Sequence, residues 1–231
     1  MQIVTTRRDG GAVRKAFSWS YSKLKNFESC PKRHWHIDLA KDVKEEESEE
    51  LSWGNEVHKS LAKRVGEGVQ LPTPMRSYEP WCVRILKTPG EILVEQKLAI
   101  TADFGPTTFF DKSAWFRAVG DVIKLNGSVA LIADWKTGKI IEDSVQLALS
   151  AACVFAHYPS IKMVRSEFIW LKEDASSRAD FARADMPGMW KGLWPRIEAL
   201  KRAHETGEYP AKPGYLCRKW CPVSKCQHHG E

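Results

Sequence analysis

The chain has 231 residues, of which 43% are hydrophobic and 28% are charged, a composition typical of a folded globular protein. It contains no uninterrupted apolar run of about 18 residues, which excludes a transmembrane helix, and its first residues lack the apolar core of a signal peptide. We therefore expect a cytoplasmic protein whose six cysteines are thiols or metal ligands rather than disulfides. The net charge of +6 indicates a polyanionic partner.

Helical signals dominate the N-terminal part of the chain. Residues 1–17 predict a flexible arm, followed by a single domain over residues 18–231. Ser20 is a favourable N-cap for the first helix. On the second helix, which follows an acidic loop, Gly54 and His58 lie on an inward-facing stripe. The predicted helices of this part are residues 20–30, 48–65 and 78–87.

Strands and helices alternate in the rest of the chain. The predicted strands are residues 91–100, 112–125, 128–136 and 162–171, and the predicted helices are residues 143–157 and 187–206. The tail, residues 210–231, is expected to be irregular. This order of elements predicts an α/β fold with a central mixed β-sheet flanked by helices.

A tight turn is predicted where Asn126-Gly127 lies between two runs rich in β-branched residues. Both turn residues tolerate the positive φ that a two-residue hairpin loop requires. With this turn Leu125 pairs with Ser128, and Asp121 lies opposite Ile132.

Two acids and a lysine lie on the predicted hairpin. Because side chains alternate along a strand, Asp121, Asp134 and Lys136 project from one face of the sheet. In the predicted register the two aspartates are diagonal neighbours about 7–8 Å apart, a separation that suits two carboxylates binding one hard cation. Neighbouring buried carboxylates repel each other unless a cation or a proton intervenes. The alternative is that each acid is a solvated residue near a strand end.

Two other polar side chains are candidates for the same site. The imidazole of His58 is a good ligand for Mn²⁺ and is tolerated beside Mg²⁺ in a carboxylate-rich site, although a lone inward-facing histidine can also be a hydrogen-bonded core residue. Gln146 lies on the helix after the hairpin, where its carboxamide could orient a nucleotide or a water molecule.

The tail carries a second group of candidate metal ligands. Cys217, Cys221 and Cys226 lie close together in what reads as a loop, and clustered thiolates bind zinc or an iron–sulfur cluster. A fourth ligand is needed for a tetrahedral site. Cys30, at a helix end before a proline, is the first choice, and His228 or His229 could instead complete a zinc site.

These segments, in this order, resemble the PD-(D/E)XK nuclease superfamily, and in particular the RecB-type nuclease domains and CRISPR-associated exonucleases that carry a cysteine-bound cluster. The resemblance covers about residues 18 to 229. It is carried by residues 20–31, 54–58, Gly120-Asp121, 134–138, Gln146 and the cysteine tail. Each motif is unspecific by itself, whereas the ordered set is specific.

The resemblance implies a restriction-endonuclease-like core and a role for each motif. His58, Asp121 and Asp134 would bind a catalytic Mg²⁺ or Mn²⁺, Lys136 would be the catalytic lysine, and Gln146 would help to position DNA. In such relatives four cysteines hold a 4Fe–4S cluster that joins the C-terminal tail to the N-terminal helix, here Cys30, Cys217, Cys221 and Cys226. The alternative for these cysteines is Zn²⁺.

The implied function is a metal-dependent DNA nuclease, in particular an exonuclease, acting in DNA recombination, repair or phage DNA processing. Its substrate would be DNA that is single-stranded or has free ends, and a helicase or recombination protein is a possible partner. The chain departs from the family in two ways. Ser150 stands where the glutamine motif usually has a tyrosine. The tail has Cys-x3-Cys-x4-Cys spacing where the family usually has Cys-x2-Cys-x5-Cys, with the same total span. The alternatives are a non-catalytic DNA-binding module and a zinc-stabilised interaction protein.

Overall fold

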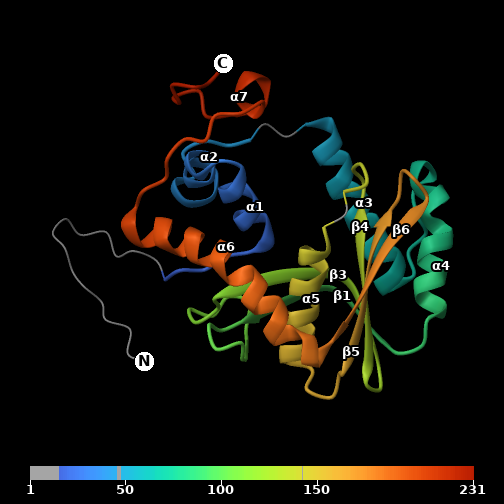
Figure 1. Cartoon of the computed structure of the whole chain (residues 1–231). Coiled ribbons are helices and arrows are strands. Elements are labelled where there is room, and N and C mark those ends of the chain that lie inside the picture. The colour runs from blue at the N-terminus through green and yellow to red at the C-terminus, as the bar shows by residue number, and fades with distance from the viewer. Residues whose placement is uncertain (1–15, 46–47, 142) are drawn as a thin grey trace.

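The computed structural model of the chain describes residues 16–45, 48–141 and 143–231. Most of the predicted N-terminal arm and part of the acidic loop lie outside these residues. The helical elements (Figure 1) are α1 (Tyr21–Ser29), α2 (Pro31–His34), η1 (Trp35–Ala40), α3 (Glu49–Glu67), η2 (Thr73–Tyr78), α4 (Glu79–Lys87), α5 (Ser144–His157), η3 (Arg183–Asp185), α6 (Met186–Thr206) and α7 (Leu216–Lys219). The strands are β1 (Glu91–Ile100), β2 (Pro106–Thr107), β3 (Phe116–Asn126), β4 (Val129–Lys136), β5 (Met163–Trp170) and β6 (Ala175–Ala182).

The described strands form one six-stranded sheet in the order β2-β1-β3-β4-β5-β6. β4 and β5 pair in parallel, whereas the other neighbours are antiparallel. A parallel pair requires a crossover connection, and α5 provides it. The prediction of an α/β fold with a central mixed sheet flanked by helices is therefore confirmed, and this core is the restriction-endonuclease-like one that the resemblance implied.

Helices cover both faces of the sheet (Figure 1). α5 and α6 enclose a core that includes Ile123 and Leu149. On the opposite face α3 and α4 enclose a second core that includes Val122 and Leu61. Val122 and Ile123 belong to different cores because successive side chains of β3 point to opposite faces. Phe17, the last residue of the predicted arm, packs against the first core.

The hairpin turn lies one residue later than predicted. The observed pairs are Asn126 with Val129 and Leu125 with Ala130, so the loop residues are Gly127 and Ser128. Gly127 alone of the two has a positive φ, 59°, which matches the two-residue hairpin loop that has glycine first. The predicted register, with Asp121 opposite Ile132, is therefore wrong by one residue on each strand.

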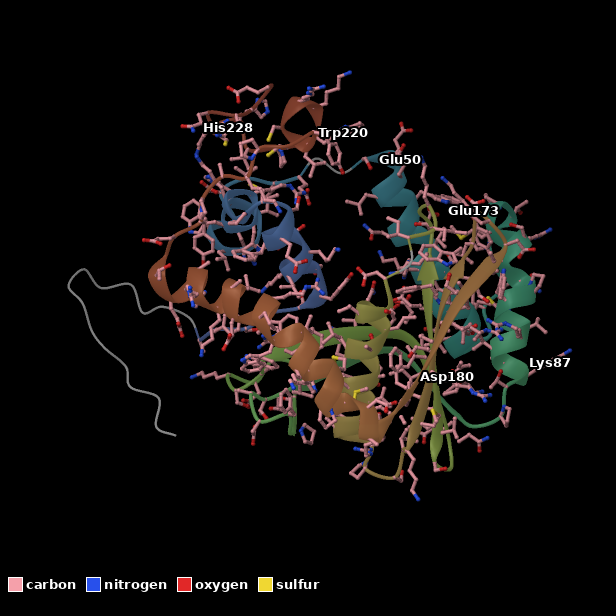
Figure 2. All side chains as sticks on the ribbon, viewed as in Figure 1. Glu50, Lys87, Glu173, Asp180, Trp220 and His228 are labelled. Atoms are coloured by element: carbon pink, nitrogen blue, oxygen red, sulfur yellow. The ribbon has the colours of Figure 1, made fainter. Side chains whose placement is uncertain are left out.

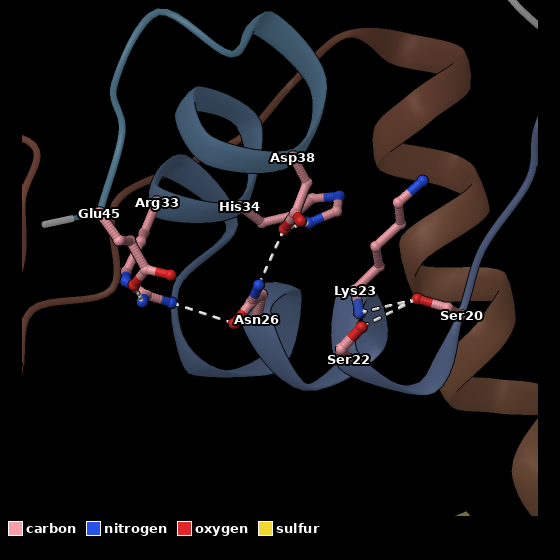
Figure 3. A network of polar contacts seen from close by, with 8 residues as sticks. All are labelled: Ser20, Ser22, Lys23, Asn26, Arg33, His34, Asp38 and Glu45. Atoms are coloured by element: carbon pink, nitrogen blue, oxygen red, sulfur yellow. Dashed lines mark hydrogen bonds and ion pairs between the residues drawn. The ribbon is translucent and has the colours of Figure 1, made fainter. Parts of the chain in front are cut away.

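A polar network joins α1, α2 and η1 (Figure 3). The carboxylate of Asp38 accepts a hydrogen bond from Asn26 at 3.0 Å and lies 2.8 Å from His34 Nδ1, while Arg33 donates to Asn26 Oδ1 at 3.1 Å. Burial raises the pKa of Asp38, but the hydrogen bonds from His34 and Asn26 outweigh burial and hold it below its ordinary value. The network fixes the chain on both sides of Cys30, which lies between α1 and α2.

Candidate active site

The candidate site begins where the ladder between β3 and β4 ends. Val122 and Ala133 form the last pair, and beyond them the backbone N–H of Trp135 donates to Asp121 Oδ2 at 2.8 Å. Continuing the observed register places Asp121 opposite Asp134 rather than diagonal to it. Asp121 is only 9% exposed, and the hydrogen bond from Trp135 fixes its carboxylate to the backbone of the neighbouring strand.

α3 brings His58 to this carboxylate. Gly54 lies one turn earlier on the same helix face, and a Cβ at Gly54 would lie 3.1 Å from Thr137 Oγ1. The missing side chain therefore allows α3 to approach the segment after β4 closely. His58 Nδ1 lies 3.3 Å from Asp121 Oδ1.

Glu95 of β1 joins His58 and Asp121, and the sequence analysis did not include it. Ligand atoms of these three residues all lie within 4.8 Å of one another, and they form the only such group of His, Cys, Asp and Glu among the described residues. Asp134 lies outside that group. The only signal for Glu95 in the sequence is an acid that follows three apolar residues in the strand Glu91–Ile100.

The backbone of Glu95 is unusual for a strand. β1 pairs with β3 on both sides of it, through Val94 and Gln96, yet Glu95 itself has a φ of 51°. A residue other than glycine rarely adopts this left-handed conformation, and strained backbone of this kind is concentrated at functional sites. The register of these two pairs places Glu95 opposite Asp121.

Asp134, Lys136 and Gln146 form a second group next to the first. Gln146 of α5 donates to Asp134 Oδ1 at 3.0 Å and accepts from Lys136 Nζ at 3.2 Å. Lys136 Nζ also lies 2.7 Å from Asp134 Oδ2 and 4.7 Å from the ring centroid of Phe168. The structure thus brings the predicted acid, lysine and glutamine into direct contact, with Gln146 hydrogen-bonded to both charged groups.

The two groups interact electrostatically, which shows in the pKa of Asp134, Glu95 and His58. Burial, together with the negative charge of Asp121, raises the pKa of Asp134 to about 6, although Lys136 opposes this shift. Partial burial and the charge of Asp121 also raise the pKa of Glu95. Burial lowers the pKa of His58, but the hydrogen bond and charge of Asp121 outweigh it and the pKa is raised. Three carboxylates are therefore crowded together, and protons or a cation must compensate for their repulsion.

The residues present fit a divalent cation. A histidine and carboxylates are the donor set that Mn²⁺ accepts and Mg²⁺ tolerates. Asp134 Oδ2 is buried and accepts no hydrogen bond from the described residues. Its contact with Lys136 is an ion pair, which leaves lone pairs on Oδ2 for a cation.

Substitution of Glu95 separates strain from charge. Glu95→Gly and Glu95→Gln both remove the carboxylate, and we expect both to weaken Mn²⁺ binding about tenfold or more in calorimetric titrations. Glycine adopts the observed φ without strain, so Glu95→Gly should be more stable than Glu95→Gln by about 1 kcal/mol in urea unfolding. Equal stability of the two variants would contradict the strain, and unchanged Mn²⁺ affinity would contradict the ligand role.

The four predicted cysteines lie around one cavity. Cys30, Cys217, Cys221 and Cys226 line one cavity of about 250 Å³, together with His228. Figure 2 shows His228 and Trp220 on the tail beside α7. The tail is held to the N-terminal helices by the N–H of Lys212, which donates to Cys30 Sγ at 3.4 Å, and by the Lys212 ammonium, which donates to the Glu28 carbonyl at 2.7 Å.

The sequence of the chain matches the family model of the PD-(D/E)XK nuclease superfamily over residues 18–226. The chain belongs to this superfamily. The superfamily motifs occur in order along the chain, and their residues make the contacts described above. Membership supports a hydrolytic nuclease activity that uses divalent metal ions.

A solved structure of a protein with low sequence identity has the same fold. The crystal structure of a candidate exonuclease from Eubacterium rectale has a TM-score of 0.57 and 13% sequence identity, covering 98% of this chain and 94% of that one. The crystal structure of SSO0001 has a TM-score of 0.45 and 13% identity, covering 94% of this chain and 89% of that one. No curated protein sequence matches the chain.

Proposed function

We propose that the protein is a divalent-metal-dependent deoxyribonuclease, specifically an exonuclease, that acts on DNA with free ends or single strands. One observation carries the proposal: Glu95, Asp121, Asp134, His58 and Lys136 converge where β1, β3, β4 and α3 meet. Three carboxylates in one place repel one another and are costly to desolvate, and a bound cation would compensate for both effects.

In this proposal His58, Glu95, Asp121 and Asp134 hold Mg²⁺ or Mn²⁺. When bound, the cation supplies Lewis acidity for hydrolysis of a phosphodiester. The ammonium of Lys136 stabilises negative charge on the reacting phosphate. Gln146 is a positioning residue, because its carboxamide accepts from Lys136 and donates to Asp134 and so fixes both side chains relative to each other.

The net charge of +6 supports binding of DNA through its phosphates. We propose that Gln146 contributes to DNA positioning through Lys136 as well as directly. Ser150, at the position of the family's tyrosine, donates to the Gln146 carbonyl at 3.1 Å, which supports a role within α5 instead of a DNA contact.

Processing of free DNA ends accords with a helicase or recombination partner in the cytoplasm. None of the described helices combines the length and apolar character needed to cross a membrane.

We further propose that Cys30, Cys217, Cys221 and Cys226 hold a 4Fe–4S cluster that joins the tail to α1 and α2 within one domain, residues 18–231. Their shared cavity supports a common metal group. A backbone N–H that donates to Cys30 Sγ supports a sulfur that carries negative charge, as cluster thiolates do.

Digestion of end-labelled DNA tests the proposed activity. We expect release of nucleotides from linear single- or double-stranded DNA with Mg²⁺ or Mn²⁺ and none with EDTA, because the carboxylates need a cation to act. Closed circular DNA of the same sequence is the control for a requirement for ends, and it should remain intact. Binding of DNA without any cleavage in either metal would favour a non-catalytic DNA-binding module.

The raised pKa values predict how metal binding depends on pH. Asp134, with a pKa of about 6, must lose its proton to bind a cation, and so must His58. Below pH 6 we therefore expect the apparent affinity for Mn²⁺ to fall about tenfold for each pH unit per proton displaced, and above the pKa of both groups we expect it to level off. Calorimetric titrations between pH 5 and pH 8 measure this. An affinity that is constant across this range would contradict the assignment.

A further inference from the structure

A groove lies on the face of the sheet opposite to Asp121, Lys136 and α5. It has a volume of about 770 Å³ and lies where β3, β4, β5 and β6 extend beyond the end of α4. Lys124, Leu131, Arg165 and Asp180 are successive cross-strand neighbours and form its floor. Asp180 of β6 is labelled in Figure 2. Since Lys124 follows Asp121 by an odd number of residues, the groove and the candidate active site open on different faces.

A buried acid organises one side of the groove. Glu167 is 1% exposed and binds Arg84 at 2.6 Å and Arg178 at 3.1 Å. Both guanidinium groups line the groove, and Glu167 compensates for only one of their two positive charges. Arg84 Nε is buried without a hydrogen-bond partner among the described residues. This wall of the groove is therefore positively charged and not fully hydrogen-bonded.

Lys124 is the most informative residue of the groove. It is 5% exposed, and no described residue forms an ion pair or hydrogen bond with its ammonium. Lysines are almost never buried to this extent unless they are paired, because a buried charge without a counter-charge is costly. Lys124 lines the groove, where an anion would supply the missing counter-charge.

We propose that this groove is a binding site for a phosphate monoester. Four cationic side chains, Arg84, Lys124, Arg165 and Arg178, face two acidic ones, Glu167 and Asp180, which leaves two positive charges for a dianionic group. Guanidinium forks match the oxygens of phosphate, and a lysine adds a point charge. The volume accommodates more than the bare ion, since pockets for small organic ligands occupy about 300–1,000 Å³. A nucleoside monophosphate therefore fits the groove in size and charge.

Isothermal titration in EDTA tests the site with three probes: inorganic phosphate, thymidine 5′-monophosphate and thymidine. We expect the nucleotide to bind, inorganic phosphate to bind more weakly, and thymidine not to bind. Lys124→Met keeps the length and apolar stem of the side chain and should weaken nucleotide binding about tenfold or more through loss of a charge-assisted hydrogen bond. Arg178→Gln, at an exposed guanidinium, should weaken it as well and guards against a folding defect in the first variant.

Two controls separate the groove from the rest of the protein. Lys191→Met removes an exposed lysine of α6 and should leave binding unchanged. Asp121→Asn alters the candidate active site and should also leave it unchanged, so the test is independent of the proposed nuclease activity. Binding that is equal in wild type and Lys124→Met overturns the proposal, as does the absence of nucleotide binding. Tighter binding of a glutamate-rich peptide than of the nucleotide also overturns it, in favour of a protein partner.

Discussion

Asp134→Asn is expected to abolish metal-dependent DNA cleavage, by about a thousandfold or more, while making the metal-free protein more stable. The loss of activity follows because the amide cannot replace a carboxylate as a ligand for a hard cation. The gain in stability follows because the pKa of Asp134 is raised to about 6 from its ordinary 3.8. Such a shift corresponds to about 3 kcal/mol, which the folded protein loses when the group ionises.

The gain in stability from Asp134→Asn should increase with pH. A carboxyl group whose pKa is raised on folding contributes stability that is present below pH 3.8 and is lost as the pH rises through about 6. The stabilisation by Asp134→Asn should therefore be small at pH 4 and full at pH 7.5 in urea unfolding with EDTA. Asp103→Asn, at an exposed carboxylate after β1 whose pKa is lowered, is the matched control and should retain cleavage. A variant that loses stability and activity together would show that Asp134 is only structural.

Cys217→Ser is expected to remove the metal from the tail. The purified wild-type protein should be brown and contain about four iron atoms per chain, and the variant should be colourless with less than about a tenth of that iron. Because the cluster would join the tail to Cys30, we expect the melting temperature to fall by about 10 °C as several kcal/mol of binding free energy are lost.

Cys82→Ala is the matched control, because Cys82 is buried in the core between α3 and α4 and away from the other four cysteines. It should keep its iron and colour even though the core loses a sulfur atom. Zinc in place of iron in the wild type would favour the zinc-stabilised interaction protein, and full retention of iron by Cys217→Ser would contradict its role as a ligand.

The faces of the hairpin could be predicted from the sequence, but its register could not. A shift by one residue on both strands leaves every side chain on its face, because the period of a strand is two residues. Asp121 and Asp134 therefore lie on the predicted face although the turn is at Gly127 and Ser128. Asn126 and Gly127 satisfy the rule for a turn as well as the observed pair does, and packing of the two strands decides between them.

Two elements of the structure had little or no local signal. β6 is rich in alanine, serine and charged residues, which have low strand propensity, and it forms because β5 offers a free edge. Glu95 lies in a correctly predicted strand, but its φ of 51° and its contact with His58 and Asp121 depend on three segments meeting. The helix caps Ser20 and Ser48, by contrast, were predictable because capping is local.

The central claim is that one cation binds between the acids at the end of the β3–β4 ladder. The most direct measurement is the anomalous difference density of crystals soaked in manganese. We predict a single strong peak in contact with Asp121, Asp134, Glu95 and His58, and its absence in crystals of Asp121→Asn. A soaked crystal with no peak among these side chains, or with its peak elsewhere in the molecule, would contradict the account.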